Sequence, residues 1–483
     1  MSTSPITTSP TTTSPITSEA HSPTGIDAAG VVAKVRGAFD SGITRPASWR
    51  REQLGQLKRL MKENEDELID TLRLDLGKPA AEAYASEIAF TNSEIRNILS
   101  NLDRWMRPRH VPLPLKFRPG SARIVPQPLG VALVIAPWNF PVQLLLLPIA
   151  TAIGAGNAVV GKPSEIAPRS SSVLARLIPR YLDQRAITVV EGGVAETTEL
   201  LEQRFDHIFY TGNGRVGRIV MAAAARHLTP VTLELGGKSP VIVDRRANLD
   251  VAARQIAFGR FANAGQACIA PDYVLVDKQV EGELVSKLVA SVRSFFGDNP
   301  KMSADYGRVV NESHWRRLKD LIDAGGYDAV ACGGEGDEAA RYLAPTILTG
   351  VKPDAAIMQD EIFGPILPII AVDSVSEAID RVNAGDKPLA LYVFSEAPDV
   401  VDEVLSSTSS GGACVNGTVL QVAVPDLPFG GVGGSGIGAY HGQRGFDTFS
   451  HLRSVLTRST RFDPPIMYPP ITALKARLMR RFL

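Results

Sequence analysis

The amino-acid sequence predicts an α/β protein built on a parallel, doubly wound sheet. From residue 130 onward, short β-rich runs alternate with helical stretches, as strands and crossover helices do in such sheets. A second α/β stretch runs from Pro240 to about Pro425. With 483 residues, of which 44% are hydrophobic, the chain is long enough for two or three domains with a large core. Sheets of this kind bind nucleotides at the carboxyl ends of their strands.

Charge and cysteine content narrow the possible function classes. Lys and Arg number 51, as do Asp and Glu, so the basic imbalance typical of nucleic-acid-binding proteins is absent. Three widely separated cysteines, Cys268, Cys332 and Cys414, form neither a disulfide framework nor a Cys-x-x-Cys pair, which favours a reducing cytoplasm. The seven histidines are scattered, so we expect no metal site.

The first 25 residues are rich in Ser, Thr and Pro, and we expect them to be disordered. Thr-Ser-Pro recurs at residues 3–5, 8–10 and 13–15, and such a segment cannot bury apolar surface. It lacks the basic start and apolar stretch of a secretory signal, and no Arg precedes Arg36, which favours a tail over a transit peptide. No apolar run reaches the roughly 18 residues of a membrane span. The longest, Leu144–Ala155, predicts a buried helix.

Two helical segments precede the alternating region. Residues 48–76 are predicted to be helical, with Leu54, Leu57, Met61, Leu68 and Leu72 on one side. Residues 80–105 are a clearer amphipathic helix, because an inward stripe recurs every three or four positions, at Ile88, Thr91, Ile95, Ile98, Leu102 and Trp105. The proline-rich segment 107–128 that follows predicts extended, edge-like chain that leaves the main body.

The strands expected after residue 130 are short and apolar. In the first stretch they are Val131–Ala136, Ala158–Gly161, Ile187–Val190, His207–Tyr210 and Val231–Leu235, with helices at Pro168–Leu182 and Arg215–His227. In the second stretch they are Val241–Val243, Tyr273–Val276, Ile366–Ala371, Leu391–Phe394 and Ala413–Val415. The Pro/Gly-rich segment Pro425–Gly438 follows, and the chain ends in the basic, amphipathic stretch Ile471–Leu483.

A cysteine and a glutamate in Gly-rich surroundings are the strongest catalytic candidates. Cys268 lies in Gly-Gln-Ala-Cys-Ile, and a thiol is a useful nucleophile only as its thiolate. A lone cysteine is usually a small core residue, but Asn263, Gly265 and Gln266 beside it are poor core material. Glu234 ends a β-like run before Gly-Gly. Two roles explain Glu234 equally well. It could be an edge-strand or ion-paired residue, or it could be a general base whose pKa is raised by burial.

Polar residues that follow predicted strands are candidates for ligand binding. Asn139, in Pro-Trp-Asn-Phe-Pro, could donate to an oxyanion, and Lys162 and Glu165 could hold ribose hydroxyls. Gly212 and Gly217 belong to a loose Gly-x-Gly-x-x-Gly between a strand and a helix, where a helix N-terminus could receive a pyrophosphate. Taken singly, each is explained equally well by an ordinary loop or surface turn.

Taken together, these segments resemble the aldehyde dehydrogenase superfamily. Six segments occur in the family's order and spacing, within a match over about residues 27–460. They are Pro137–Pro141, Lys162–Glu165, Leu233–Lys238, Gly265–Cys268, Glu361–Gly364 and Pro428–Gly431. The ending, Gly438–Gly442 through Thr448–His451, resembles the class 3 branch, which includes fatty, aromatic and coniferyl aldehyde dehydrogenases.

The resemblance implies a Rossmann-like NAD-binding domain, an α/β catalytic domain and a β-rich oligomerisation arm. We expect the NAD-binding domain at 26–106 and 129–235, the catalytic domain at 236–425 and the arm at 107–128 and 439–462. The arm implies a homo-oligomer, and we expect a homodimer. We expect the basic amphipathic tail, 463–483, to dock on this chain or a partner subunit, and contact with a membrane surface is the less favoured alternative.

The resemblance also implies a role for each motif residue in the oxidation of an aldehyde to a carboxylic acid through a thiohemiacetal and a thioester. Cys268 would be the nucleophile, Glu234 the general base, and Asn139 with the Cys268 N–H the oxyanion hole. The cofactor NAD would be held by Lys162 and Glu165 at the adenosine ribose, Gly212 and Gly217 at the pyrophosphate, Glu361 at the nicotinamide ribose and Phe363 beside the nicotinamide.

Two features bear on cofactor and substrate, and two alternatives remain. The Glu165 carboxylate accepts from a ribose 2′-OH and repels a 2′-phosphate, which favours NAD, with NADP still possible. The apolar loop Asn416–Val424 lacks the His often present in class 3 members and favours hydrophobic aldehydes.

An acylating, coenzyme A-dependent dehydrogenase is one alternative function, against which Glu234 argues. A catalytically silent scaffold is the other, and the joint presence of Cys268, Glu234 and Asn139 argues against it.

Overall fold

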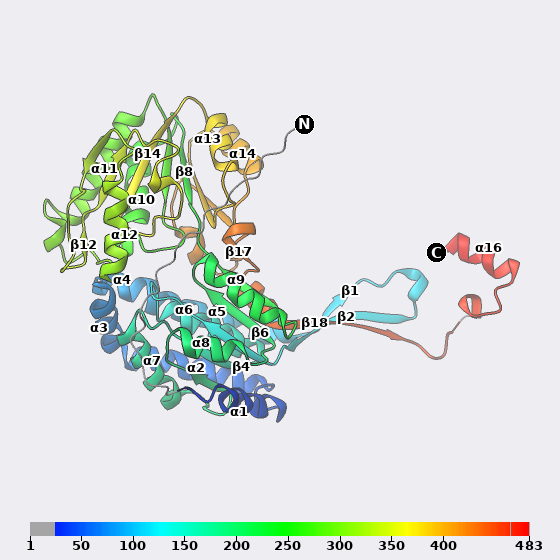
Figure 1. The fold of residues 1–483 in the computed structure, drawn as a ribbon. Helices are drawn as coiled ribbons and strands as arrows, with labels where there is room; N and C mark the ends of the chain where they lie inside the picture. Colours follow the sequence, from blue (N-terminus) through cyan, green and yellow to red (C-terminus); the bar gives the residue numbers. More distant parts are fainter. Residues whose placement is uncertain (1–24, 464, 483) are drawn as a thin grey trace, which may run out of the picture.

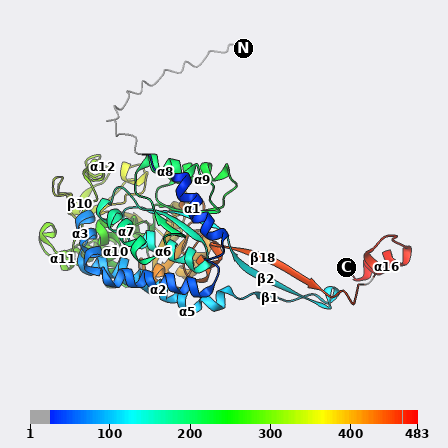
Figure 2. The ribbon, with the colours of Figure 1, turned by 90° about the horizontal axis from the view of Figure 1, so that it is seen from below.

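The computed structural model describes residues 25–463 and 465–482, which form a two-part body and a long arm that projects from it (Figure 1). The predicted Ser/Thr/Pro-rich tail lies outside the described residues, apart from its last residue. Within the described residues, no helix combines the length and apolar character needed to cross a membrane. A view from below shows the arm leaving the body as a thin extension (Figure 2).

The first part of the body is built on a six-stranded sheet of order β17-β7-β6-β3-β4-β5. Its strands are β3 (Val131–Ile135), β4 (Ala158–Lys162), β5 (Ile187–Val189), β6 (His207–Thr211), β7 (Val231–Glu234) and β17 (Gly436–Ile437). All neighbours are parallel except β17 and β7. The first strand of this sheet along the chain is β3. The next two strands, β4 and β5, are added on one side of it, and β6 and β7 on the other, so the strand order reverses between β3 and β6. A reversal of this kind leaves a crevice for a ligand.

Helices pack on this sheet largely as predicted. They are α1 (Ala28–Asp40), α2 (Ala47–Glu63), α3 (Glu65–Leu76), α4 (Ala80–Ala83), α5 (Phe90–Met106), α6 (Gln143–Ala155), α7 (Pro168–Tyr181), α8 (Val194–Leu201) and α9 (Gly214–Ala225). Residues 48–76 are helical as predicted, but the helical stretch is not continuous. It is interrupted at Asn64, which has non-helical φ/ψ angles and turns its Nδ2 back to the Leu60 carbonyl, 2.7 Å away. The expected inward stripe of α5 is buried, and α6 is buried at every residue.

A π-helical segment, Tyr84–Ala89, joins α4 to α5 and was not predicted. The i→i+5 pattern of a π-helix is rare and occurs mostly as single turns, often at functional sites. Here it carries Glu87 and Ile88, both buried, into the core beneath the loop that follows β3.

The second part of the body has a seven-stranded sheet of order β10-β13-β14-β9-β8-β15-β16. The strands are β8 (Pro240–Val243), β9 (Tyr273–Asp277), β10 (Ala329–Cys332), β13 (Thr346–Thr349), β14 (Ile366–Val372), β15 (Ala390–Phe394) and β16 (Gly412–Val415). The helices are α10 (Leu249–Phe261), α11 (Glu281–Phe296), α12 (Glu312–Asp323), α13 (Val375–Asn383) and α14 (Pro398–Ser407). The five predicted strands are present, whereas β10 and β13 were missed.

Both faces of the second sheet are covered, which explains why its strands are apolar without interruption. Val241 and Val243 of β8 belong to one hydrophobic cluster and Ile242 to another on the opposite face. Buried parallel strands read as continuous apolar runs rather than as alternating patterns. A third cluster fills the first part of the body between its sheet and helices.

The arm is a three-stranded antiparallel sheet of order β1-β2-β18. It contains β1 (Arg109–Val111), β2 (Gly120–Pro128) and β18 (Ser450–Arg458). Between residues 439 and 449, α15 (Gly442–Thr448) packs against α5 and α6 instead of joining the arm sheet. The final helix, α16 (Ala473–Phe482), lies at the far end of the arm, away from the body (Figure 1).

Candidate active site

The carboxyl edge of the first sheet brings several predicted site residues together. Lys162 ends β4 and pairs with Ile135 at the end of β3, while Glu234 ends β7 and pairs with Thr211 at the end of β6. Asn139 follows β3 and Gly212 follows β6, so both lie at the same edge. Because parallel strands present their carboxyl ends on one side, the structure brings these residues to one sheet edge.

The loop that carries Cys268 has an unusual backbone. After α10, a short 3₁₀ turn places Asn263, Ala264 and Gly265 in succession at positive φ angles of 50°, 50° and 73°. Side chains other than glycine and asparagine rarely adopt this region, so the turn is held by its surroundings. A Cβ at Gly265 would stand 2.3 Å from the Gly364 carbonyl oxygen. Glycine therefore allows the Cys268 loop to touch the segment that carries Glu361 and Phe363.

Cys268 lies half-buried near two carboxylates. Burial raises the pKa of its thiol first, and the negative charges of Glu361 and Glu234 raise it further. The backbone N–H groups of Cys268 and Ile269 act in the opposite direction, because they favour the thiolate. The thiol therefore lies within electrostatic range of both carboxylates.

The other two cysteines, Cys332 and Cys414, are partly buried in strands of the second sheet. Cys332 ends β10, where its thiol faces the Pro345 carbonyl oxygen at 3.5 Å, and burial raises its pKa to about 11. Cys414 lies in the edge strand β16, and burial raises its pKa as well.

Glu234 is buried, with only 2% of its surface exposed, and neither carboxylate oxygen has a hydrogen-bond partner among the described residues. Burial raises the pKa of this carboxyl well above its ordinary value. Its backbone is fixed, because the Glu234 carbonyl accepts from Gly212 N at 3.0 Å and β7 lies between β6 and β17. Neither an edge-strand position nor an ion pair therefore explains this glutamate. A fixed backbone with an unpaired carboxyl suits a group that takes up and releases a proton.

Glu361 occupies space that a glycine leaves open. A Cβ at Gly236 would stand 1.9 Å from Glu361 Oε2, so any other residue there would displace the Glu361 carboxylate. Burial, and next the charge of Asp272, raises the pKa of Glu361 to about 8. The Gly237 N–H favours the carboxylate and lowers this pKa in part. A pocket of about 480 Å³ opens beside these residues and is also lined by Lys238, Arg381 and Lys387.

Asp272, which was not predicted, ties three segments of the site together. Its Oδ1 accepts from Ile362 N at 3.0 Å and from Arg260 Nη1 at 3.3 Å, and its Oδ2 accepts from Lys238 Nζ at 2.6 Å. Asp272 and Arg260 are buried. The available signal was an Asp directly before an apolar strand, which is too common to mark a site without tertiary contacts.

Asn139 is buried and hydrogen-bonded to the loop before Cys268. Its Nδ2 donates to the Gln266 carbonyl at 3.0 Å, and Asn263 Nδ2 donates to the Asn139 and Gln266 carbonyls at 2.9 and 3.1 Å. Gln266 Nε2 returns a bond to the Asn263 carbonyl at 2.9 Å. The sequence marked Asn263 and Gln266 only as poor core material, whereas the structure shows that they connect Asn139 to Cys268.

Four of the predicted cofactor residues, Lys162, Glu165, Gly212 and Gly217, lie at or just after the carboxyl ends of β4 and β6. Buried Lys162 donates to the Pro163 carbonyl at 2.7 Å, and its Nζ lies 3.4 Å from Oε2 of the exposed Glu165. Burial lowers the pKa of Lys162, and Glu165 partly offsets this effect. A Cβ at Gly217 would stand 2.9 Å from Leu235 Cδ2, so the start of α9 packs closely on the segment after Glu234. An ammonium, a carboxylate and a helix N-terminus fit a cofactor with ribose and pyrophosphate groups.

Phe363 is partly buried and has a positive φ of 49°. Its ring packs edge-on against Trp138 at 5.4 Å between centroids, and Trp138 packs in the same way against His314 at 5.1 Å. Phe363 therefore lies beside the loop that carries Trp138 and Asn139.

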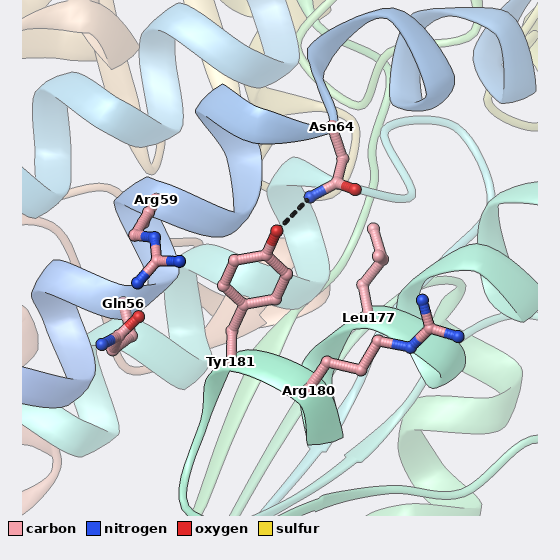
Figure 3. Close-up of a pocket in the computed structure, with 6 residues that line it drawn as sticks. All are labelled: Gln56, Arg59, Asn64, Leu177, Arg180 and Tyr181. Carbon is pink, nitrogen blue, oxygen red and sulfur yellow. Dashed lines mark hydrogen bonds between the residues drawn. The ribbon is translucent and has the colours of Figure 1, made fainter.

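A separate surface pocket of about 380 Å³ lies between α2 and α7 and contains none of the predicted site residues (Figure 3). Arg59, Arg180 and Tyr181 are among its lining residues, and Asn64 Nδ2 donates to Tyr181 Oη at 3.0 Å. Among residues 25–463 and 465–482, no group of three or more His, Cys, Asp or Glu is arranged to hold a metal ion.

The chain is similar to known proteins of one family. The model of the aldehyde dehydrogenase family matches residues 3–455. The chain is 48% identical to a dimeric, NADP-preferring aldehyde dehydrogenase of Rattus norvegicus, over 92% of this chain and 98% of the relative. It is also 48% identical to aldehyde dehydrogenase family 3 member A2 of Mus musculus, over 94% of this chain and 93% of the relative.

Solved structures give the same result. The substrate-bound state of AldH from Staphylococcus aureus superimposes with a TM-score of 0.91 at 43% identity, covering 94% of this chain and 99% of that one. An NAD-dependent aldehyde dehydrogenase from Sinorhizobium meliloti superimposes with a TM-score of 0.83 at 32% identity, covering 91% and 88%. The chain belongs to the aldehyde dehydrogenase family, and its activity is the NAD(P)-dependent oxidation of an aldehyde.

Proposed function

We propose that this enzyme oxidises hydrophobic aldehydes to carboxylic acids through a covalent intermediate on Cys268. Water activated by Glu234 then hydrolyses this intermediate. The observation that supports this proposal most strongly is the pairing of a half-buried thiol with a buried carboxyl whose two oxygens have no partner among the described residues. A structural carboxylate at that position would be expected to have hydrogen-bond partners.

The first half-reaction takes place at Cys268. The thiol gives its proton to solvent water, and the thiolate attacks the aldehyde carbon. A carbon–sulfur bond forms as the carbonyl π bond breaks, which leaves a thiohemiacetal whose oxygen carries the negative charge. One Nδ2 hydrogen of Asn139 is used by the Gln266 carbonyl, so the second can donate to this oxygen together with the Cys268 N–H. Pre-placed donors stabilise the developing charge without further reorganisation.

Lys162, Glu165, Gly212, Gly217 and Glu361 hold the cofactor in this proposal, and Phe363 packs beside its nicotinamide. When bound, the cofactor supplies the acceptor for the hydride of the thiohemiacetal. The relative from Rattus norvegicus is named NADP-preferring. We propose that the exposed Glu165 carboxylate disfavours a 2′-phosphate, so Glu165→Gln should raise kcat/KM with NADP relative to NAD. An unchanged ratio would remove Glu165 from cofactor choice.

The second half-reaction belongs to Glu234. Its carboxylate takes a proton from water, the resulting hydroxide attacks the thioester carbon, and the carbon–sulfur bond breaks to release the acid and the Cys268 thiolate. A raised pKa makes the carboxylate a stronger base than an exposed glutamate. This step separates the enzyme from an acylating dehydrogenase, in which coenzyme A would take the acyl group. Product formation that depends on coenzyme A would reverse this assignment.

The substrate class follows from the loop Asn416–Val424. Val419 and Val422 pack against the same hydrophobic cluster as Cys268. Tyr392 Oη donates to the Ile269 carbonyl at 2.6 Å and accepts from Val419 N at 3.3 Å, so this loop is tied to the Cys268 loop. An apolar wall beside the nucleophile favours medium-chain, long-chain or aromatic aldehydes. If acetaldehyde is turned over faster than every longer or aromatic aldehyde in a panel, this substrate class is wrong.

The enzymatic assignment itself is tested by NADH formation at 340 nm with that panel. A catalytically silent scaffold would give no NADH with any member of the panel. The Cys268→Ala variant separates covalent catalysis from any other route, since wild-type turnover without the thiol would eliminate the mechanism.

We propose that the enzyme is a homodimer assembled through the arm. The relative from Rattus norvegicus is named dimeric, and Leu452 and Leu456 of β18 expose apolar side chains at 38% and 53%. Unpartnered strands with apolar residues invite pairing with another chain. Light scattering of the wild type should give twice the 51.8 kDa chain mass, and a monomer at micromolar concentration would contradict this proposal.

A further inference from the structure

A fully buried ion pair lies directly behind the loop that carries Asn139. Lys78 and Glu87 are both 0% exposed, and Lys78 Nζ donates to Glu87 Oε1. Lys78 follows the left-handed glycine that ends α3, and Glu87 belongs to the π-helical segment. Neither residue contacts the thiol or takes part in the chemistry proposed above.

Both members of the pair also contact residues 139–143. Lys78 Nζ donates to the Asn139 carbonyl at 3.1 Å and lies 4.1 Å from the centre of the Phe140 ring. Glu87 Oε2 accepts from Val142 N at 2.8 Å and from Gln143 N at 3.2 Å. The ammonium therefore holds one side of the loop and the carboxylate holds the other, at the N-terminus of α6.

Stability alone does not account for such a pair. Desolvation of two charges costs several kcal/mol, and well-packed apolar residues of similar volume often serve as well or better. A negative charge at a helix N-terminus is favourable, but a neutral capping side chain satisfies the same N–H groups. What an ion pair adds is a defined position for the backbone it binds, because each charged group directs several short hydrogen bonds.

The backbone it binds is continuous with the oxyanion donor. The Asn139 carbonyl that Lys78 holds is also held by Asn263, and the Asn139 side chain reaches the Gln266 carbonyl, two residues before Cys268. A shift of the Asn139 backbone would move its Nδ2 relative to the thiol. Misplacement of a catalytic group by about 1 Å can cost on the order of 100-fold in rate.

We propose that Lys78 and Glu87 are positioning residues for the oxyanion hole, which fix the backbone of residues 139–143 so that Asn139 Nδ2 faces the substrate oxygen. This inference rests on the proposed function, because it assumes that Asn139 is an oxyanion donor.

A double-mutant cycle with Asn139 tests the inference. Lys78→Met keeps the length of the side chain and removes the ammonium, and it should lower kcat/KM for aldehyde by about 10- to 100-fold, mostly through kcat. In the Asn139→Ala background the same substitution should change kcat/KM by no more than about threefold, because nothing remains to be positioned. Full multiplication of the two effects would overturn the inference and leave the proposed function standing. Wild-type activity of Asn139→Ala would overturn both.

A second variant separates positioning from stability. Lys78→Met with Glu87→Gln leaves no unpaired buried charge, so it should recover the melting temperature lost in Lys78→Met. Its kcat/KM should stay low, because the grip on the Asn139 carbonyl is still missing. Recovery of activity together with stability would show a purely structural role. If Lys78→Met does not fold, this double variant and Glu87→Gln carry the same cycle with Asn139→Ala.

Arg50 provides a matched control. It is a buried cation near the opposite end of α6, where it donates to the carbonyls of Gly154 and Arg45 at 3.0 and 2.9 Å. Arg50→Met should lower the melting temperature without lowering kcat/KM per folded molecule. A loss of kcat/KM as large as that of Lys78→Met would mean that any damage to α6 reaches the site, and the inference would fail.

Discussion

The two sides of the Cys268 thiol differ in how their polar groups are satisfied. On the Asn139 side, Asn139, Asn263, Gln266, Lys78 and Glu87 are joined by a continuous set of hydrogen bonds and an ion pair. On the Glu234 side, the carboxyl is just as buried, yet neither oxygen has a partner among the described residues. The difference follows from what each side does. Oxyanion donors work best when fixed in advance, whereas a base must exchange protons and admit water.

Pairing Glu234 would defeat its proposed role. A hydrogen bond or an opposite charge that favours the carboxylate lowers its pKa and makes it a weaker base. The environment does the reverse, because burial without a partner raises the pKa. The following predictions test this contrast, from the largest expected effect to the smallest.

Cys268→Ala removes the sulfur atom that lies between the two sides. It should lower the rate of NADH formation by about 10⁴-fold or more, as loss of a nucleophile does in other covalent enzymes. The measurement is the initial rate at 340 nm with the best aldehyde of the panel. Cys414→Ala, which removes a thiol on β16, is the control and should keep the wild-type rate. Loss of activity in the control would weaken the assignment of the nucleophile.

Glu234→Gln breaks the unpaired side alone. It should lower the steady-state rate by about 10²- to 10⁴-fold, because water no longer has a base. The first half-reaction should survive, so rapid mixing should still show a burst of about one NADH per active site. If the burst disappears together with the steady state, Glu234 acts before hydrolysis and the contrast between the two sides is drawn in the wrong place.

Lys162→Ala tests whether the proposed cofactor site acts independently of both sides. Loss of a charge-assisted hydrogen bond of roughly 1.5–3 kcal/mol should raise KM for the cofactor by about 10- to 100-fold, with kcat within a few-fold of wild type. Lys62→Ala, an exposed lysine on α2, is the matched control. A fall in kcat with unchanged KM would place Lys162 in the chemical step instead.

Glu361→Gln tests buried acidity through stability. The folded pKa of about 8 exceeds the ordinary value of 4.5, so between these values the folded state keeps a proton that the unfolded state has lost. The free energy of unfolding should therefore fall as pH rises through this window. The melting temperature of Glu361→Gln should fall less than that of wild type between pH 5 and about 8.5. An identical fall in both proteins would contradict the raised pKa, and the exposed Glu52→Gln serves as control.

Removal of residues 463–483 should have the smallest effect. Because α16 lies at the far end of the arm, the truncated enzyme should keep kcat/KM for small aldehydes within about twofold, since it loses no contact near Cys268 (Figure 1). Flotation with anionic liposomes, with and without this segment, tests the alternative of membrane contact. Flotation of the full chain alone would favour the membrane over docking on a partner subunit.

Local sequence predicted most elements of the fold because their patterns are periodic. The inward stripe of α5 and the apolar strands of both sheets required only the burial of one face or of both. The break at Asn64 was missed because it depends on one backbone conformation within a helical pattern. Strands β10 and β13 were missed because both are short, and β10 is also an edge strand with exposed residues.

The site was predicted in part for a similar reason. Glu234, Cys268 and Asn139 stand in short Gly-rich or Pro-rich segments next to strands, where local composition is unusual. Asp272, Arg260, Lys78 and Glu87 stand in ordinary contexts, and only their partners make them notable. A charged residue in an amphipathic helix is usually a surface residue, so the burial of Glu87 was not foreseeable from its neighbours.

By itself, the sequence determined the α/β architecture, the order of the strands along the chain and the identity of the candidate nucleophile and base, because these depend on periodicity and on motifs read locally. The tertiary structure alone decided which of these residues meet, that Glu234 is buried without a partner, and that Lys78 and Glu87 lie behind Asn139. The physical reason is that burial and pairing arise from contacts between segments far apart in the chain. The same carboxylate is a solvated surface group or a buried base according to what surrounds it.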